Sequence, residues 1–318
     1  MKNVTLRQLR VFAAAAKHQS FGKAAEELHL TPPAVSMQIR ELESQVGLPL
    51  FDRTGRAVSL TVTGEYLLVY VRKMLATLKD AEDAIAKFRG LEAGRLTIGM
   101  VSTAKYYMPR LLARFREDHP EVEVRLEVGN RERLVALMQA GEVDLAVMGR
   151  PPREFATRAE PFAVHPHVIV TAPDHPLMQA EHASAAALAQ YGFIVREPGS
   201  GTRAAMEQYF EEHRIAPPVV MEMASNETIK QAVMAGMGVS FLSLHTIGLE
   251  LKTGQIATPD VENMPVLRRW YVVNTLAKTL SPAAEAFRYF VLERAERFLA
   301  REYGALGPHG LMQPLEKQ

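Results

Sequence analysis

The first sixty residues carry three closely spaced helical patterns, and they constrain the fold more than any other part of the chain. Apolar residues recur at helical spacing in Leu6–His18, which predicts a first helix. Ser20 is a candidate N-cap for a second, shorter helix. Pro32 and Pro33 stand where a third helix starts, and we expect that helix to run from Ala34 to about Val46. Two short helices around a tight turn are typical of a helix-turn-helix.

The outer face of the third helix carries side chains that suit the major groove of DNA. A helix in this position presents its N-terminal end to base edges. The predicted DNA-facing residues are Thr31, Pro33, Ser36, Gln38 and Arg40. The 62 N-terminal residues hold eight basic and five acidic side chains, whereas the whole chain has a net charge of only +1. This local excess favours contact with phosphates. The alternative is an ordinary three-helix bundle with a solvated face.

A hairpin pattern follows the third helix. Leu48–Phe51 is mostly apolar, a turn occupies Asp52–Arg56, and apolar residues alternate in Val58–Val62. This pattern predicts a short β-hairpin, or wing. Arg53 and Arg56 would lie near its tip, where they could contact the DNA backbone or the minor groove.

A long helix is predicted from Thr63 onwards. Its apolar residues alternate spacings of four and three, like the a and d positions of a coiled coil. These positions are Leu67, Val71, Met74, Leu78, Ala81, Ile85 and Phe88. The pattern indicates a dimerisation helix, and a helix packed on one side of a core is the alternative. Gly90 and Gly94 mark a linker at its end.

The segment from Arg95 to about residue 300 alternates strands with helices. This order is typical of parallel α/β units, which bind ligands beyond the carboxyl ends of their strands. The predicted strands are 95–100, 122–128, 144–148, 168–172, 193–196, 219–223, 239–242 and 270–273. The predicted helices are 108–115, a stretch through 134–138, and 184–189, 203–213, 226–235 and 281–299.

The chain resembles the LysR-type transcriptional regulators. Ala24–Glu43 and Gly47–Arg53 are similar to the DNA-binding head of that family, and the similarity extends to about residue 300. Five further segments resemble the CbbR branch, which regulates carbon-fixation operons of the Calvin cycle. They are 102–106, 128–131, 148–152, 196–203 and 226–233.

This resemblance implies a modular fold. The expected domains are a winged helix-turn-helix in 1–62, a linker and dimerisation helix in 63–92 and an effector-binding domain in 93–303. The effector domain would be an α/β, two-lobed structure like a periplasmic binding protein. Lobe I would comprise about 95–165 and 269–303, and lobe II about 166–268. Residues 304–318 mix glycine, proline and polar residues, so we expect a disordered tail.

Candidate effector-binding residues follow the predicted strands. Hydroxyl groups, glycines and free N–H groups at helix starts suit an anion. The candidates are Ser102, Thr103, Ala104, Asn130, Arg150, Glu197, Gly199, Ser200, Gly201, Thr202, Arg203 and Asn226. Plain helix capping, a glycine turn and, for Arg150, a hinge salt bridge are the alternatives. The segment around Gly199 lacks the lysine of a nucleotide-hydrolysing P-loop.

Family resemblance also implies the partners. They are double-stranded promoter DNA, RNA polymerase, a second copy in a homodimer, and further copies in a homotetramer. The effector would be a small phosphorylated metabolite held between the lobes. Ribulose bisphosphate, phosphoglycolate, phosphoenolpyruvate and a nicotinamide nucleotide all remain candidates.

Composition excludes several other classes. The chain has no cysteine, and its ten histidines show no metal-binding spacing, so we expect no metal or cofactor. No nucleophile or triad spacing points to an enzyme. No apolar run is long enough to span a membrane, and we find no signal segment, so we expect a cytoplasmic protein. A regulator of another operon remains open, as does a small-molecule binding protein whose N-terminal helices serve assembly only.

Overall fold

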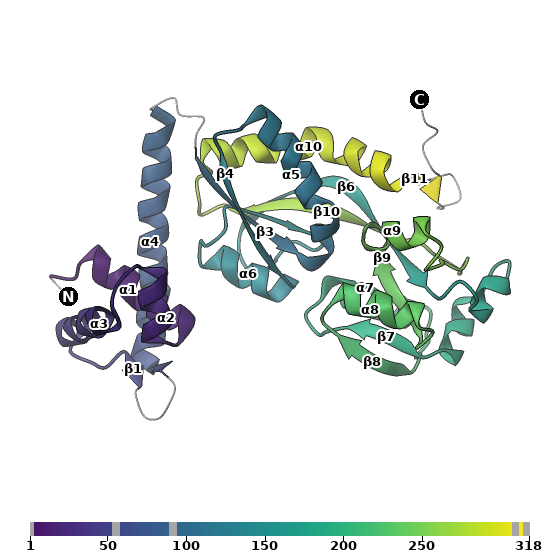
Figure 1. Ribbon diagram of the computed structural model, residues 1–318, viewed down its shortest axis with the longest axis horizontal. Helices are drawn as coiled ribbons and strands as arrows, with labels where there is room; N and C mark the ends of the chain where they lie inside the picture. Colours follow the sequence, from purple (N-terminus) through teal and green to yellow (C-terminus); the bar gives the residue numbers. More distant parts are fainter. Residues whose placement is uncertain (1–2, 53–57, 89–93, 307–311, 314–318) are drawn as a thin grey trace. The chain divides into compact units, whose positions relative to one another are not determined.

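The computed structural model describes residues 3–52, 58–88, 94–306 and 312–313 (Figure 1). The chain divides into two compact units. The first contains residues 1–86 with 140–142, and the second contains the rest. Within the described residues, no helix combines the length and apolar character needed to cross a membrane.

The first unit is a small helical head. Its elements are α1 (Leu6–His18), α2 (Phe21–Glu27), α3 (Pro32–Val46), β1 (Phe51–Asp52), β2 (Ser59–Leu60) and α4 (Val62–Phe88). The side chains of Thr5, Ser20 and Thr31 accept hydrogen bonds from backbone N–H groups and cap α1, α2 and α3. Each cap satisfies an N–H group that has no partner inside its helix. The predicted helix-turn-helix is therefore present, with α3 starting two residues earlier than expected.

The wing is shorter than the sequence pattern indicated. Phe51 pairs with Leu60 in the antiparallel ladder of β1 and β2. Val62, expected in the second strand, is instead the first residue of α4. Arg53 and Arg56 lie outside the described residues.

The predicted apolar seam of α4 divides between two environments, because Met74 and Ile85 are exposed whereas Leu67 and Val71 pack in the head. Val71 is fully buried in the core of the head, and Leu67 packs against the same core. Five other apolar residues of α4 line a separate exposed face, which we call the α4 stripe. They are Val62, Tyr66, Val69, Tyr70 and Met74.

The second unit is built on one eight-stranded sheet. Its strands lie in the order β4-β3-β5-β10-β6-β9-β7-β8. Their bounds are β3 Arg95–Val101, β4 Glu123–Gly129, β5 Leu145–Met148, β6 Thr157–Val170, β7 Phe193–Arg196, β8 Val219–Met223, β9 Val239–Ser243 and β10 Val266–Thr275. Parallel pairing joins β3 to β4 and β5, and likewise β7 to β8 and β9.

Two long antiparallel strands connect these parallel groups and define two lobes. β6 and β10 pair along their whole lengths, from Thr157↔Thr275 to His167↔Val266. The C-terminal half of β10 pairs with β5, and the C-terminal end of β6 pairs with β9. Lobe I therefore surrounds β3, β4 and β5, and lobe II surrounds β7, β8 and β9, as the family resemblance implied.

Helices cover the sheet in both lobes. The helices are α5 Met108–Asp118, α6 Arg131–Gln139, α7 Gly201–Glu212, α8 Asn226–Met234, α9 Gly248–Lys252 and α10 Pro282–Tyr303. Figure 1 shows α10, near the end of the chain, lying beside α5 on lobe I. Phe115 of α5 packs edge-on against Phe287 and Phe290 of α10, and these rings belong to the largest apolar core.

Several predicted elements take another form. A 3₁₀ helix, η3 (Ala185–Gln190), replaces the α-helix expected at 184–189. Further 3₁₀ helices among the described residues are η1 Ser102–Tyr106, η2 Pro176–Gln179 and η4 Leu244–Thr246. Within the expected disordered tail, β11 (Ala305–Leu306) pairs with β12 (Met312–Gln313). The other residues after Leu306 lie outside the described part of the chain.

Candidate functional site

The first candidate site is the outer face of α3 in the head. Thr31, Pro33 and Arg40 are exposed, whereas Ser36 and Gln38 are half-buried. The Ser36 carbonyl accepts a hydrogen bond from Arg40 Nε at 3.3 Å, and Gln38 Nε2 donates to a glutamate of the same helix at 3.2 Å. The five predicted side chains therefore reach this surface to different extents.

Met37 also lies on this outer face, and the sequence analysis missed it. Its side chain is 49% exposed, although buried methionines usually fill cores. An apolar side chain at such a position can contact the methyl group of thymine in the major groove. The signal in the sequence was its place between Ser36 and Gln38, at the centre of the expected recognition surface.

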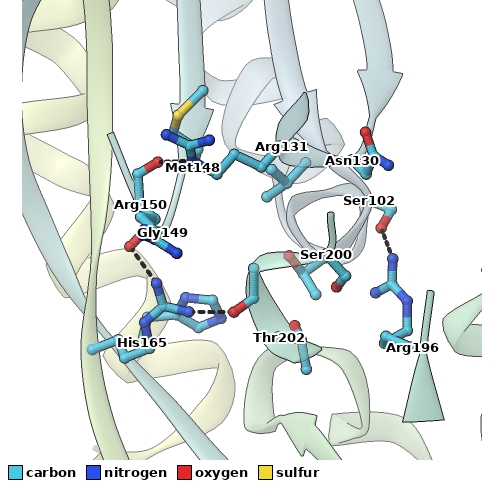
Figure 2. Close-up of a pocket in the computed structure, with 14 residues that line it drawn as sticks. Ser102, Asn130, Arg131, Met148, Gly149, Arg150, His165, Arg196, Ser200 and Thr202 are labelled. Carbon is cyan, nitrogen blue, oxygen red and sulfur yellow. Dashed lines mark hydrogen bonds between the residues drawn. The ribbon is translucent and has the colours of Figure 1, made fainter. Parts of the chain in front are cut away.

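The second candidate site is a cavity between the two lobes of the second unit (Figure 2). It encloses about 390 Å³, part of it open to solvent. The lining residues are Val101, Ser102, Thr103, Asn130, Arg131, Met148, Gly149, Arg150, His165, Arg196, Ser200, Gly201, Thr202 and Arg268. Most follow the carboxyl ends of β3, β4, β5 and β7, which is where parallel sheets place ligands.

Seven of the predicted effector-binding residues line this cavity. They are Ser102, Thr103, Asn130, Arg150, Ser200, Gly201 and Thr202. Ser102 Oγ accepts a hydrogen bond from Arg196 Nη2 at 3.1 Å, a contact that joins the lobes. Asn130 Oδ1 accepts a hydrogen bond from the backbone N–H of Arg133 at 2.9 Å and so caps the start of α6.

Five predicted residues are not among those lining the cavity, and three of them have other structural roles. Ala104 is fully buried in the apolar core of lobe I, because η1 turns its side chain inward. Gly199 adopts a left-handed conformation with φ of 81°, so its role is to form the turn before α7. Arg203 Nη1 donates to the carbonyl of Arg196 at 3.0 Å, and its guanidinium also pairs with Glu207. These contacts hold it within lobe II.

Glu197 and Asn226 also lie outside the lining of the cavity. Both instead accept hydrogen bonds from Arg196, which does line it. The two carboxylate oxygens of Glu197 accept from Arg196 Nε at 2.7 Å and Nη2 at 2.9 Å. Asn226 Oδ1 accepts from Arg196 Nη1 at 2.6 Å. Ser225, rather than Asn226, caps α8. Both residues therefore position a guanidinium in the wall of the cavity.

Seven lining residues were missed. They are Val101, Arg131, Met148, Gly149, His165, Arg196 and Arg268. Arg131, Gly149 and Arg196 are immediate neighbours of predicted residues, so widening each candidate segment by one position would have included them. Arg268 and His165 lie on β10 and β6, the two connecting strands, and no local motif marked them.

The charges of the cavity are not balanced. Arg131 pairs with Glu154 at 3.0 Å, and Arg196 pairs with Glu197 at 2.7 Å. Arg268 instead donates to two carbonyl groups, those of Gly201 at 2.7 Å and Gly149 at 3.1 Å.

Neither Arg268 nor the neighbouring Arg150 has a carboxylate partner within residues 94–306. Burial, together with the charge of Arg150, lowers the pKa of Arg268. An enclosed guanidinium without a counter-ion favours an anionic ligand.

The start of α7 adds uncharged donors to the same wall. Ser200 is the N-cap of this helix, but its side chain makes no capping hydrogen bond. The first N–H groups of a helix have no partner inside it and carry the positive end of its dipole. Ser200, Gly201 and Thr202 all line the cavity. In the described part of the chain, by contrast, no group of three acidic or histidine side chains could hold a metal ion.

Profiles of known protein families match both units of the chain. A profile of the LysR substrate binding domain matches residues 89–296. A second profile, that of the bacterial regulatory helix-turn-helix protein of the lysR family, matches residues 6–65. The two matches correspond to the cavity-bearing unit and to the helical head.

Individual relatives are similar over nearly the whole chain. The HTH-type transcriptional regulator CfxR of Cupriavidus necator is 50% identical over 308 residues, which is 97% of each chain. The RuBisCO operon transcriptional regulator of Allochromatium vinosum is 48% identical over 94% of this chain and 99% of its own.

Among solved structures, the regulatory domain of Synechocystis PCC6803 CcmR in complex with 2-PG is 40% identical, with a TM-score of 0.61. That match covers 63% of this chain and 96% of the CcmR domain.

Proposed function

The chain belongs to the LysR family of transcriptional regulators, and on this premise we propose that it controls carbon-fixation genes in response to a small phosphorylated anion. The helical head would bind promoter DNA, and the cavity between the lobes would bind the anion. The observation that carries the effector class is the pair of guanidinium groups, Arg150 and Arg268, without carboxylate partners among residues 94–306.

The names of two relatives support carbon-fixation genes as the targets. CfxR of Cupriavidus necator and the RuBisCO operon regulator of Allochromatium vinosum are both about half identical to this chain, and both match it from end to end. Such similarity over both units supports a common type of target. A regulon for another pathway has no comparable support among these relatives.

The cavity and one solved relative support the effector. The regulatory domain of CcmR is recorded with 2-PG. 2-Phosphoglycolate, which combines a phosphate with a carboxylate, would satisfy two cationic positions at once. Arg150 and Arg268 would bind its charges, and the N–H groups at the start of α7 would bind remaining oxygens.

The proposed assembly is a homodimer through α4 and a homotetramer through further contacts. A dimer would place two α3 helices on two half-sites of an operator. Effector binding between the lobes would change the lobe angle and the spacing of the heads, and with it DNA bending and contact with RNA polymerase. Such a regulator acts in the cytoplasm, where bacterial DNA lies.

Replacing Arg268 tests the effector site. We expect Arg268→Met to lower the affinity for 2-phosphoglycolate by about tenfold or more, because it removes a charge-assisted hydrogen bond. Thermal unfolding of the full chain with increasing ligand measures this, since a ligand of the folded state raises the melting temperature by mass action.

Arg269 provides the matched control. It is the next residue of β10, is exposed and does not line the cavity. Arg269→Met should respond to 2-phosphoglycolate as the natural protein does. Equal losses of affinity in both variants, or none in Arg268→Met, would refute the proposed site.

A further inference from the structure

Arg196, the last residue of β7, brings a positive charge to the cavity wall, but its donors are already in use. Its side chain is only 3% exposed. Nη1 donates to Asn226 Oδ1 at 2.6 Å, and Nη2 donates to Ser102 Oγ at 3.1 Å, the contact between the lobes that Figure 2 shows. Nε and Nη2 also donate to the carboxylate of Glu197, at 2.7 and 2.9 Å. All three nitrogens of this guanidinium therefore have partners within the protein.

The backbone turn before α7 holds Glu197 beside this guanidinium. Neighbouring side chains of a strand point to opposite faces, but β7 ends at Arg196, so the next side chain can turn back onto it. The carbonyl of Glu197 accepts a hydrogen bond from the N–H of Ser200 at 3.2 Å, and Gly199 completes the turn with its left-handed backbone. The carboxylate is thus fixed next to the cavity without lining it.

The charges around the cavity are unequal in their exposure to water. Among the described residues that line the cavity, four are arginines and none is acidic. Two of these arginines have carboxylate partners outside the lining, Glu197 for Arg196 and Glu154 for Arg131. The Glu197 side chain is 19% exposed and that of Glu154 is 47% exposed, and Glu132, which approaches the turn before α7, is also exposed. Because water screens an exposed charge, Glu197 lowers the positive potential of the cavity more than the other two carboxylates.

We propose that Glu197 is a specificity-determining residue, which limits the negative charge of the anion that the cavity accepts. This inference rests on the proposed function of the cavity. Glu197 cancels the charge of Arg196 and occupies its donors, so that Arg150 and Arg268 supply the uncompensated charge. Its carboxylate also repels a bound anion, and this repulsion grows with the charge of the anion. Glu197 should therefore disfavour a bisphosphate more strongly than a monophosphate.

Glu197→Gln tests this role with a side chain of nearly the same shape. The amide oxygen can still accept a hydrogen bond from Arg196, so the main loss is the negative charge. Removing one partner of a buried ion pair leaves the other charge uncompensated, and a bound anion would then compensate it. The variant should therefore bind anions more tightly than the natural protein. A residue with a purely structural role in the wall would give the opposite result.

Three probes of increasing charge measure the effect. Methyl phosphate, 2-phosphoglycolate and ribulose bisphosphate carry about two, three and four negative charges near pH 8, and the Coulomb energy is proportional to this charge. We expect Glu197→Gln to gain affinity about fivefold for methyl phosphate, about tenfold for 2-phosphoglycolate and about twenty-five-fold for ribulose bisphosphate. Calorimetric titration of the full chain at low ionic strength measures these gains. They should shrink at high salt, where counter-ions screen the charge.

Glu207→Gln is the matched control. Glu207 also pairs with an arginine of lobe II, Arg203 at 2.8 Å, but neither residue lines the cavity and the Glu207 side chain is 56% exposed. Arg203 keeps a second carboxylate partner in Glu222. This variant should bind all three anions as the natural protein does. Glu197→Asp, which keeps the negative charge, should retain the natural order of affinities.

The outcomes separate this inference from the effector proposal. If the natural protein binds 2-phosphoglycolate, an unchanged or lower affinity in Glu197→Gln overturns only the role of Glu197. Gains that do not grow with the charge of the anion, or equal gains in Glu207→Gln, do the same. Binding by Glu197→Gln alone would support the role of Glu197 and refute 2-phosphoglycolate as the effector. If neither protein binds any of the three anions, both proposals are wrong.

Discussion

Gly64 shows how a single residue fixes the geometry of the head. It lies in the first turn of α4, and a Cβ atom there would lie 2.2 Å from the carbonyl oxygen of Leu50 and 2.9 Å from Leu60 Cδ2. The Leu50 carbonyl also accepts a hydrogen bond from the N–H of Thr61. This backbone atom is therefore held in place, and only glycine lets α4 begin so close to the wing.

Gly64→Ala should accordingly lower the free energy of unfolding of the head. We expect a loss of about 1–3 kcal/mol or more, because the methyl group meets backbone rather than a flexible side chain. Gly22→Ala on α2 is the control, since a Cβ there meets nothing closer than 3.8 Å. That variant should be neutral or stabilised by up to ~1 kcal/mol. Urea unfolding followed by circular dichroism compares them, and equal stability of the two variants would contradict the packing described.

Some residues that line the cavity could be predicted from the sequence, and others could not. Ser200, Gly201 and Thr202 form a local pattern of small and hydroxyl residues between a strand and a helix, so they were predictable. Arg268 and His165 line the same cavity, but they lie within strands and have no motif. Arg268 reaches the cavity through contacts with Gly149 and Gly201, which are distant in sequence. Only the pairing of β6 with β10 brings these residues together.

At the scale of elements, α4 divides its apolar residues between two tasks. Val71 and Leu67 complete the core of the head, and Leu75 packs against the same core. The α4 stripe remains exposed, with Val62 and Tyr66 each at 71% and Tyr70 at 61%. Monomeric proteins seldom expose a contiguous apolar face of this kind. We therefore propose that the dimer contact lies on the α4 stripe, which shares Met74 with the seam first expected.

Charges in the α4 stripe should separate the dimer. We expect the double substitution Tyr66→Lys and Tyr70→Lys to shift the protein to a smaller species in sedimentation velocity. The new lysine side chains would place unpaired positive charges from both copies in the dimer contact. Glu65→Gln, an exposed change outside the stripe, should leave the assembly unchanged. An unaltered sedimentation coefficient for the double variant, with its helical content retained, would show that dimers form elsewhere.

Elements with a clear period were predictable, and the long strand β6 was not. The regular alternation of β4 and the helical spacing of apolar residues in α1, together with the capping residue Ser20 of α2, identified those elements correctly. β6 was expected only from Val168, although it begins at Thr157. Pro161 and Pro166 interrupt that stretch, and proline disfavours a central strand because it has no N–H to donate. Pairing with β10 overrides this local preference.

At the scale of the whole molecule, the chain joins a helix-turn-helix head to a LysR substrate binding domain. The family relationship accounts for this combination. Within the cavity, Arg150 and Arg268 have no carboxylate partner among residues 94–306. We propose that they bind a phosphorylated anion. The output of such binding must be a change in how the heads bind DNA.

DNase I footprinting on the upstream region of the chain's own gene and of a carbon-fixation operon from the same organism tests this account most directly. The natural protein should protect a defined sequence, and 2-phosphoglycolate should change the length or pattern of protection. Arg268→Met should protect the same sequence and fail to respond to the ligand. Protection that no phosphorylated anion alters would contradict the sensor, and the absence of any selective protection would contradict the regulator itself.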